Sequence, residues 1–307
     1  MYTNIKSTKT LTILSIILFL INFNVHAAAA DVAEKIGECT LALNKGDLKS
    51  AVKASKEILK LDPKNREGWL CNGRALGGEG QYAEAVSALE AAVANSPADF
   101  DGIIAYLFLG NLHKDNNKNV EAIAAYEKSI KISEAEKNDK YKRISLNLMA
   151  EAQTQNKDLD AALTSYLSGS KLAQNDNERA DSFERLATTY SALGQYDYAI
   201  EYQIKGVSMQ QKAGTLDQYA NANLALGNIY IAAKNYADAE KTFANLAKFS
   251  NDQGGAYFEA KADVGLAQTK AASGDAAAAK MWIEKAKTIA KDTKDKALAQ
   301  EIDLATK

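Results

Sequence analysis

Catalysis requires several reactive side chains at compatible spacing, and this sequence offers few. Only two histidines occur, His26 near the N-terminus and His113 within an apolar segment. At that position a buried structural histidine is favoured over a metal ligand or a general base. The only two cysteines, Cys39 and Cys71, have no histidine at the spacing of a zinc site. The sequence therefore predicts no metal site, no cofactor and no catalytic centre.

Two further patterns resemble chemical motifs but lack essential parts. The glycine-rich run at residues 77–80 has neither the lysine nor the preceding strand of a phosphate-binding loop, so we expect a turn there. Acid pairs such as Asp238 and Glu240 have the spacing of a solvated helix face. We therefore expect a protein that is not an enzyme and acts by binding.

The composition favours an all-helical globular protein. Hydrophobic residues make up 47% and charged residues 25% of the 307 positions, and only two prolines, Pro63 and Pro97, interrupt the chain. The formal net charge is −2 and both signs are mixed along the sequence. Such a balance argues against a nucleic-acid partner or an anionic membrane surface.

The N-terminal residues have the pattern of an export signal. Lys6 and Lys9 precede an apolar run at residues 11–23, which is too short to span a membrane. Small residues at Val25 and Ala27 fit signal-peptidase cleavage after Ala27 or one of the next alanines. Residues 1–27 are therefore predicted to be a signal peptide, with an uncleaved anchor as the alternative. No lipobox cysteine follows, and no stable membrane insertion is expected after cleavage.

Export leaves two possibilities for the cysteines. Secreted proteins form disulfides readily, and pairing requires Cα atoms within about 7 Å. Cys39 and Cys71 lie in consecutive repeats of the pattern described next, so they are candidates to meet. The alternative is two separate small core residues.

The two prolines are 34 residues apart, and a unit of about that length recurs through the chain. With Trp69 at position 4, seven repeats begin near Val32, Arg66, Ile103, Arg143, Ala180, Ala220 and Ala260. Position 20 is always alanine: Ala51, Ala85, Ala122, Ala162, Ala199, Ala239 and Ala279. Position 8 is always small: Cys39, Gly73, Gly110, Ala150, Ala187, Gly227 and Ala267.

This regularity predicts two antiparallel helices per repeat, with small residues where they cross closely. A close contact would explain why Gly110 and Gly227 are accepted inside helices, where glycine costs roughly 1 kcal/mol relative to alanine. Turn-forming residues lie between the two helices of every repeat, at residues 45–47, 78–80, 116–117, 156–158, 193–195, 234–235 and 273–275.

These motifs resemble the tetratricopeptide repeat family over about residues 31–293. Repeat 2 matches best, through Trp69, Gly73, Leu76, Ala85, Leu89, Ala92 and Pro97. Repeats 3 to 7 lack the terminal proline and mostly run to 37–40 residues, as in longer-repeat members such as kinesin light chain. The resemblance implies an α-solenoid of about seven helix-turn-helix repeats over residues 28–307. A last helix at about residues 295–306 would cap the stack.

The family's concave groove is lined by positions 2, 5, 9, 12 and 13 of each first helix. The resemblance therefore implies six peptide-groove candidates: Arg74, Asn111, Asn147, Glu151, Glu184 and Asn228. Asparagine can pair with both polar groups of an extended backbone. Alternatively, the three asparagines bond between neighbouring helices or to water. The family's chaperone-tail clamp is not matched, because Ile36 and Thr40 stand where lysine and asparagine would be needed.

Two functional hypotheses follow. The first is an exported, bacterial-type scaffold that binds extended peptide segments or a partner protein in its concave groove. The periplasm is the expected compartment, with secretion as the alternative. The second hypothesis is a structural subunit of an envelope assembly that uses the outer faces of the solenoid.

Overall fold

The computed structural model describes residues 29–97 and 99–305, and the predicted signal peptide lies outside the described residues. Within the described part the chain is helical and contains no strand, which confirms the predicted all-α fold class. The chain divides into two compact units, Met1–Leu148 and Met149–Lys307. We call them the N-terminal and C-terminal units and describe each by itself.

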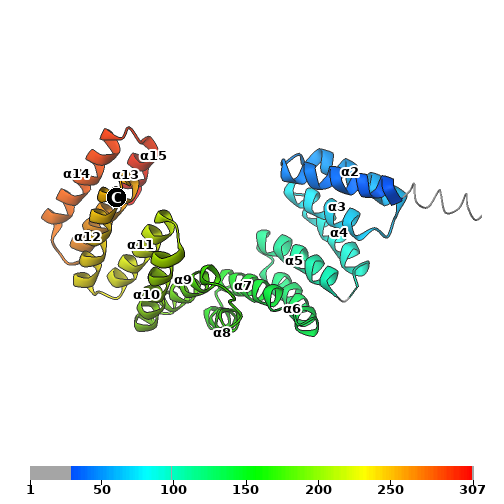
Figure 1. Cartoon of the computed structure of the whole chain (residues 1–307), viewed down its shortest axis with the longest axis horizontal. Coiled ribbons are helices and arrows are strands. Elements are labelled where there is room, and N and C mark those ends of the chain that lie inside the picture. Colours follow the sequence, from blue (N-terminus) through cyan, green and yellow to red (C-terminus); the bar gives the residue numbers. More distant parts are fainter. Residues whose placement is uncertain (1–28, 98, 306–307) are drawn as a thin grey trace, which may run out of the picture. The chain divides into compact units, whose positions relative to one another are not determined.

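The N-terminal unit is built from helix hairpins (Figure 1). A helix covers residues 29–44 and packs with α2 into the first hairpin. The following helices are α2 (Leu48–Leu61), α3 (Arg66–Gly78), α4 (Tyr82–Ala94), α5 (Phe100–Asp115), α6 (Asn119–Ala135) and α7 (Asp139–Gln155), whose C-terminal part belongs to the next unit. Successive helices α2 to α6 pack on one another, which gives the repeating hairpin order that the sequence predicts.

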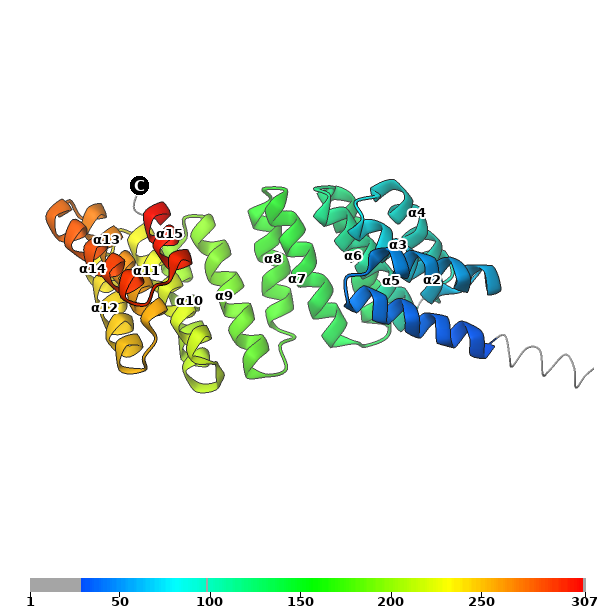
Figure 2. The same ribbon diagram turned by 90° about the horizontal axis from the view of Figure 1, so that it is seen from above.

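The C-terminal unit continues the same pattern (Figure 2). Its helices are α8 (Leu159–Ser170), α9 (Asp176–Ala192), α10 (Tyr196–Ala213), α11 (Leu216–Ala232), α12 (Tyr236–Asp252), α13 (Ala256–Ala272), α14 (Ala276–Asp292) and α15 (Lys296–Ala305). Helix α15 buries Leu298 and Ile302 against α13 and α14, so it covers the apolar face that the last repeat would otherwise expose.

The turn inside each repeat has one residue with a left-handed backbone. These residues are Gly46, Gly80, Asn117, Lys157, Gly194, Lys234 and Gly274, all inside the predicted turn segments. In each case the next backbone N–H bonds a carbonyl five residues earlier, as from Gln195 to Tyr190, and this closes the end of the first helix. A following side chain often caps the second helix, as Asn235 does for the N–H of Asp238.

The alanines at position 20 lie in the helix crossings, as predicted. Six of the seven are fully buried and Ala279 is 6% exposed. The glycines at position 8 meet a different neighbour from the one the spacing suggested. A Cβ added to Gly110 would lie 2.5 Å from the ring of Tyr126, and one added to Gly227 would collide with the ring of Phe243. These glycines therefore make room for the large residue at position 24 of the same repeat.

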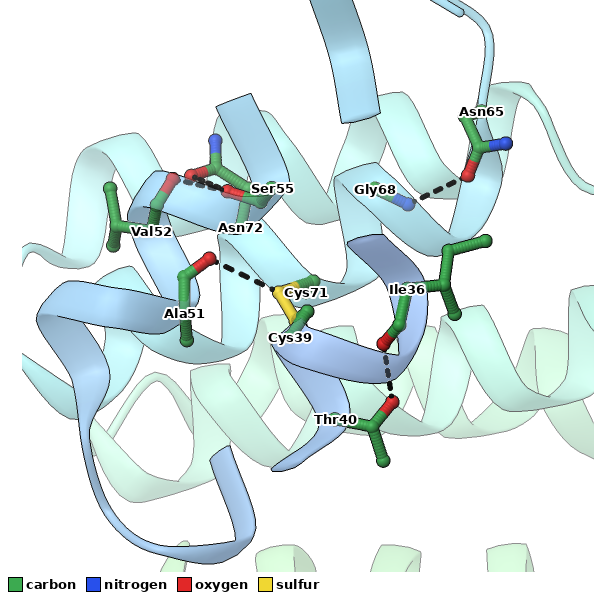
Figure 3. Close-up of a disulfide and its surroundings, with 10 residues drawn as sticks. All are labelled: Ile36, Cys39, Thr40, Ala51, Val52, Ser55, Asn65, Gly68, Cys71 and Asn72. Carbon is green, nitrogen blue, oxygen red and sulfur yellow. Dashed lines mark hydrogen bonds between the residues drawn. A yellow bond between two sulfur atoms is a disulfide. The ribbon is translucent and has the colours of Figure 1, made fainter. Parts of the chain in front are cut away.

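Two other predicted residues have clear structural roles. His113 is buried and its Nδ1 lies 2.8 Å from the Tyr82 hydroxyl, so it is a core histidine. Burial lowers the pKa of His113, against the opposing charges of Glu121 and Glu90. Cys39 and Cys71 form a disulfide with Cα atoms 6.4 Å apart, which settles the question of their pairing (Figure 3). The bond joins the first helix of repeat 1 to the first helix of repeat 2.

Candidate binding faces

In the N-terminal unit, the faces of three first helices meet at a pocket of about 180 Å³. Each helix contributes residues three and four apart, which lie on one side of a helix. The lining residues are Ile36, Cys39, Thr40 and Leu43 from the helix at 29–44, Arg66, Glu67, Leu70, Cys71 and Arg74 from α3, and Phe100, Asp101, Ile104 and Phe108 from α5. We call this the Arg74 pocket.

The charges of the Arg74 pocket are unevenly paired. Arg66 contacts both Glu67 and Asp101, with an Nη2 to Oδ1 distance of 3.1 Å for the second. Arg74 has no carboxylate within ion-pair distance among the described residues. Its guanidinium carbon instead lies 4.6 Å from the centroid of the Phe108 ring. Burial lowers the pKa of Arg74, with Glu67 opposing, but a guanidinium stays charged at any physiological pH.

The disulfide forms part of this pocket's wall. Figure 3 shows Ile36, Cys39 and Thr40 along the first helix, with Cys39 bonded to Cys71 on α3. The Cys71 sulfur also lies 3.4 Å from the backbone oxygen of Ala51. The covalent bond therefore fixes the separation of two of the three helices that line the pocket.

The two other predicted groove residues of the N-terminal unit, Asn111 and Asn147, are hydrogen-bonded within the fold or buried. Asn111, on α5, accepts a 2.6 Å hydrogen bond from the Tyr126 hydroxyl on α6. This is the bond between neighbouring helices that the sequence left open as an alternative. Asn147, on α7, is only 8% exposed. Neither side chain lines the Arg74 pocket.

In the C-terminal unit, the first helices α7 and α9 are joined by a network of hydrogen bonds around Arg185. Arg185, on α9, donates 2.8 Å hydrogen bonds to Glu151 on α7 and to Asp181, and its guanidinium lies 5.7 Å from the centroid of the Tyr166 ring. Burial disfavours its charge, but the bonds to Glu151 and Asp181 outweigh burial and raise the pKa of Arg185. Glu151, a predicted groove residue, is thus bound within the fold.

Glu184 and Asn228 complete the predicted set. Glu184 accepts a 3.0 Å hydrogen bond from Gln210 and lines a pocket of about 340 Å³ together with Asp181, Arg185 and Thr188. Asn228, on α11, is exposed, and no hydrogen bond of its amide is found among the described residues. The pocket beside Glu184 thus has two carboxylates, Asp181 and Glu184, and one arginine, Arg185, whereas the Arg74 pocket has two of each charge.

The sequence analysis did not identify Phe108, the ring beneath Arg74, or the arginine Arg185 as residues of the binding faces. Both stand at position 6 of a first helix, which is not one of the family's groove positions. The signal was present as an arginine at position 9 of one repeat and a phenylalanine at position 6 of the next.

Among the described residues, no group of histidine, cysteine and acidic side chains gathers as a metal site, and no helix is long and apolar enough to cross a membrane.

Two family models of the tetratricopeptide repeat match the chain. One covers residues 38–100 and 70–139, and the other covers residues 180–212. Together with the helix hairpins and their small crossing residues, these matches support tetratricopeptide repeats within residues 38–139 and 180–212, as the sequence motifs predicted.

Solved structures show the same fold. The apo form of RapI superposes with a TM-score of 0.66 and 14% identity, over 88% of this chain and 79% of that chain. A tetratricopeptide repeat protein from Parabacteroides merdae gives 0.56 and 15%, over 90% and 99%. A Podosopora anserina putative kinesin light chain with nearly identical repeats gives 0.56 and 18%, over 63% and 97%. No curated protein matches the chain.

Proposed function

We propose that this protein is an exported, non-catalytic scaffold that binds an extended segment of a partner protein on the face formed by the first helices of its repeats. Tetratricopeptide repeat proteins generally mediate protein–protein interactions. The observation that carries the proposal is the Arg74 pocket. It has apolar side chains in its walls, such as Ile36 and Ile104, and contains a charged guanidinium that has no carboxylate at ion-pair distance in the described part of the chain.

Export, with the periplasm as the compartment, is supported by two independent features. One is the predicted signal peptide at residues 1–27, and the other is the Cys39–Cys71 disulfide, since such bonds persist in oxidising compartments. N-terminal sequencing of the protein from its native host is the test. We expect the mature chain to begin at Ala28 or within the next few residues. A cytoplasmic species that retains Met1 would contradict export.

Each unit offers its own contacts on its first helices. In the C-terminal unit Asn228 is exposed and able to pair with a peptide backbone, and Glu184 lies among carboxylates that favour lysine or arginine in the segment. Asn111 is already bonded to Tyr126, so we assign it to the fold. The proposed contact residues are therefore Arg74, Glu184 and Asn228.

Affinity capture by the oxidised chain from an envelope extract, followed by mass spectrometry, would provide the partner. We expect Asn228→Ala to weaken binding of that partner about fivefold or more while the melting temperature stays unchanged. Asn111→Ala is the matched comparison, because it should lower stability and leave affinity intact. Loss of stability with Asn228→Ala at unchanged affinity would contradict the role of Asn228.

A structural subunit of an envelope assembly is the second candidate function. It is favoured by exposed apolar side chains on second helices, among them Val120 on α6, Tyr198 on α10 and Met281 on α14, which are 68%, 54% and 59% exposed. Substituting these three with serine separates the two functions. The triple variant should still capture the partner if the first helices bind it, and should no longer capture it if the second helices do.

A further inference from the structure

We propose that the Arg74 pocket binds the side-chain carboxylate of an aspartate or glutamate in an extended partner segment, together with an apolar side chain two residues away. This inference rests on the proposed function and specifies the chemistry of the segment. It concerns the N-terminal unit alone.

The charge requirement comes from the unequal pairing of the two arginines. Arg66 is held by two carboxylates, Glu67 and Asp101, so its charge is already balanced within the fold. Arg74 is exposed to solvent and its guanidinium carbon lies over the Phe108 ring, a contact that restricts the side chain and leaves N–H groups for a carboxylate. An arginine held in this way loses less conformational freedom on binding than a mobile one.

The apolar requirement comes from the walls. Ile36 and Ile104 are only partly buried by the fold, and the disulfide joins the helix that carries Ile36 to α3 in the same pocket wall. A partner side chain placed against these groups would remove apolar surface from water on both sides. A polar side chain there would lose its hydration without gaining a bond.

The spacing requirement comes from the geometry of an extended chain. Side chains at i and i+2 point to the same side and are separated by roughly 6.6 Å, whereas i and i+1 point to opposite sides. Since the guanidinium and the apolar walls belong to one pocket, the acidic and apolar residues must share one side of the segment.

The proposed carboxylate is that of an internal acidic residue, because an acidic residue at a C-terminus carries a second negative charge. The pocket lining holds two arginines, Arg66 and Arg74, and two acids, Glu67 and Asp101, so its net formal charge is zero. An acidic residue at a C-terminus would bring two negative charges close to these acids, and the second would be repelled. A single internal acidic side chain avoids that repulsion.

Titration calorimetry on the oxidised full chain with four synthetic peptides tests the proposal. Each peptide is a capped polar 12-mer of serine, threonine and glycine that carries Leu-Ser-Glu, Leu-Ser-Gln, Ser-Ser-Glu or Leu-Ser-Lys at its centre. A fifth peptide has leucine next to a free C-terminal carboxylate and no glutamate. We expect the Leu-Ser-Glu peptide to bind roughly tenfold tighter than the Leu-Ser-Gln and terminal-carboxylate peptides.

Variants then locate the site. Arg74→Gln should abolish the preference for glutamate over glutamine, and Arg74→Lys should retain part of it. Arg179→Gln is the matched control, because Arg179 is a surface arginine of the C-terminal unit that pairs only with its own helix through Asp176. That variant should bind as the original protein does.

The outcomes separate this inference from the proposed function. Equal binding of the Leu-Ser-Glu and Leu-Ser-Gln peptides, or an unchanged glutamate preference in Arg74→Gln, overturns the inference. Binding of the Leu-Ser-Lys peptide alone, lost on Glu184→Gln, also overturns it but supports peptide binding by the scaffold. If none of the five peptides binds at millimolar concentration and the captured partner is insensitive to Arg74→Gln and Asn228→Ala, both proposals fail.

Discussion

Arg74 and Arg185 illustrate how two arginines over aromatic rings acquire different roles. Arg74 lies over Phe108 in the N-terminal unit, and Arg185 lies over Tyr166 in the C-terminal unit. Arg185 is also bonded to Glu151 and Asp181, so its charge is balanced by the fold. Arg74 has the ring and no carboxylate. The contact with an aromatic ring therefore does not separate the role assigned to Arg185 from the role proposed for Arg74. The two differ in whether a carboxylate of the fold pairs with the guanidinium.

The same contrast extends to the covalent structure of the two units. The N-terminal unit holds both cysteines of the chain, in a disulfide that lies in the wall of its pocket. The C-terminal unit relies on packing and ion pairs, including the pair between Lys261 on α13 and Glu301 on α15. The predictions below test whether the units differ in this way, in order of decreasing effect.

Removing the disulfide should have the largest effect. Replacing Cys39 and Cys71 with alanine releases a constraint across 32 residues of sequence, which costs about 3.7 kcal/mol in the chain-entropy account. Hydrogen exchange should show lost protection in the helix at 29–44 and in α2, while amides of α9 to α14 keep theirs. Loss of protection across both units would contradict the expectation that the disulfide stabilises the N-terminal unit alone.

The glycines at position 8 should behave alike in both units. Gly110→Ala and Gly227→Ala each place a methyl group against the ring of Tyr126 or Phe243, and both should lower the free energy of unfolding by about 2 kcal/mol despite the gain in helix propensity. Lys241→Ala, at an exposed position of α12, is the control and should change stability by less than about 0.5 kcal/mol. A harmless Gly227→Ala would mean that the ring of Phe243 is not held as described.

The two arginines should differ in their effect on stability. Arg185→Ala breaks bonds to two carboxylates, both partly exposed to solvent, and should cost about 1–2 kcal/mol after allowance for screening. Arg74→Ala removes only the contact with Phe108 and should cost about 0.5–1 kcal/mol. Urea denaturation of both variants provides the measurement. Equal costs would contradict the assignment of Arg185 to the fold and Arg74 to binding.

These cases show what the sequence could predict. Alanine at position 20 and the turns that contain Gly46 and Lys234 were predictable, because close crossings favour small residues and because glycine, asparagine and aspartate favour turns. The partner of Gly110, the bond from Tyr126 to Asn111 and the stacking of Arg74 were not. Each depends on where a long side chain from another helix ends, and repeat spacing does not specify that.

Asp263 should make a small, pH-dependent contribution in the C-terminal unit. It is fully buried, with Lys285 Nζ 3.0 Å away, and burial raises its pKa more than Lys285 lowers it. An acid with a raised folded pKa binds protons more readily when folded, so its contribution to stability falls as pH rises above 3.8 through the folded pKa.

Asp263→Asn should remove that dependence. The variant should be at least as stable as the original chain at pH 7, and its advantage should shrink as pH falls toward the unfolded pKa. Unfolding by urea across this pH range measures both effects. A variant that is clearly less stable at pH 7 would show that the pair with Lys285 stabilises the fold.

The smallest effect is expected at the turns, where neighbouring repeats of the C-terminal unit use the same geometry with different residues. Lys234 has φ of 58° and Gly194, in the preceding repeat, has 73°. A side chain in the left-handed region is strained by its Cβ, and glycine is not, although glycine also makes the unfolded chain more flexible. Lys234→Gly should therefore stabilise the chain by less than about 1 kcal/mol, and Gly194→Ala should destabilise it by about 1 kcal/mol. Thermal unfolding of both variants gives the comparison. If Lys234→Gly instead lowers the melting temperature, the lysine contributes more through its side chain than its backbone costs.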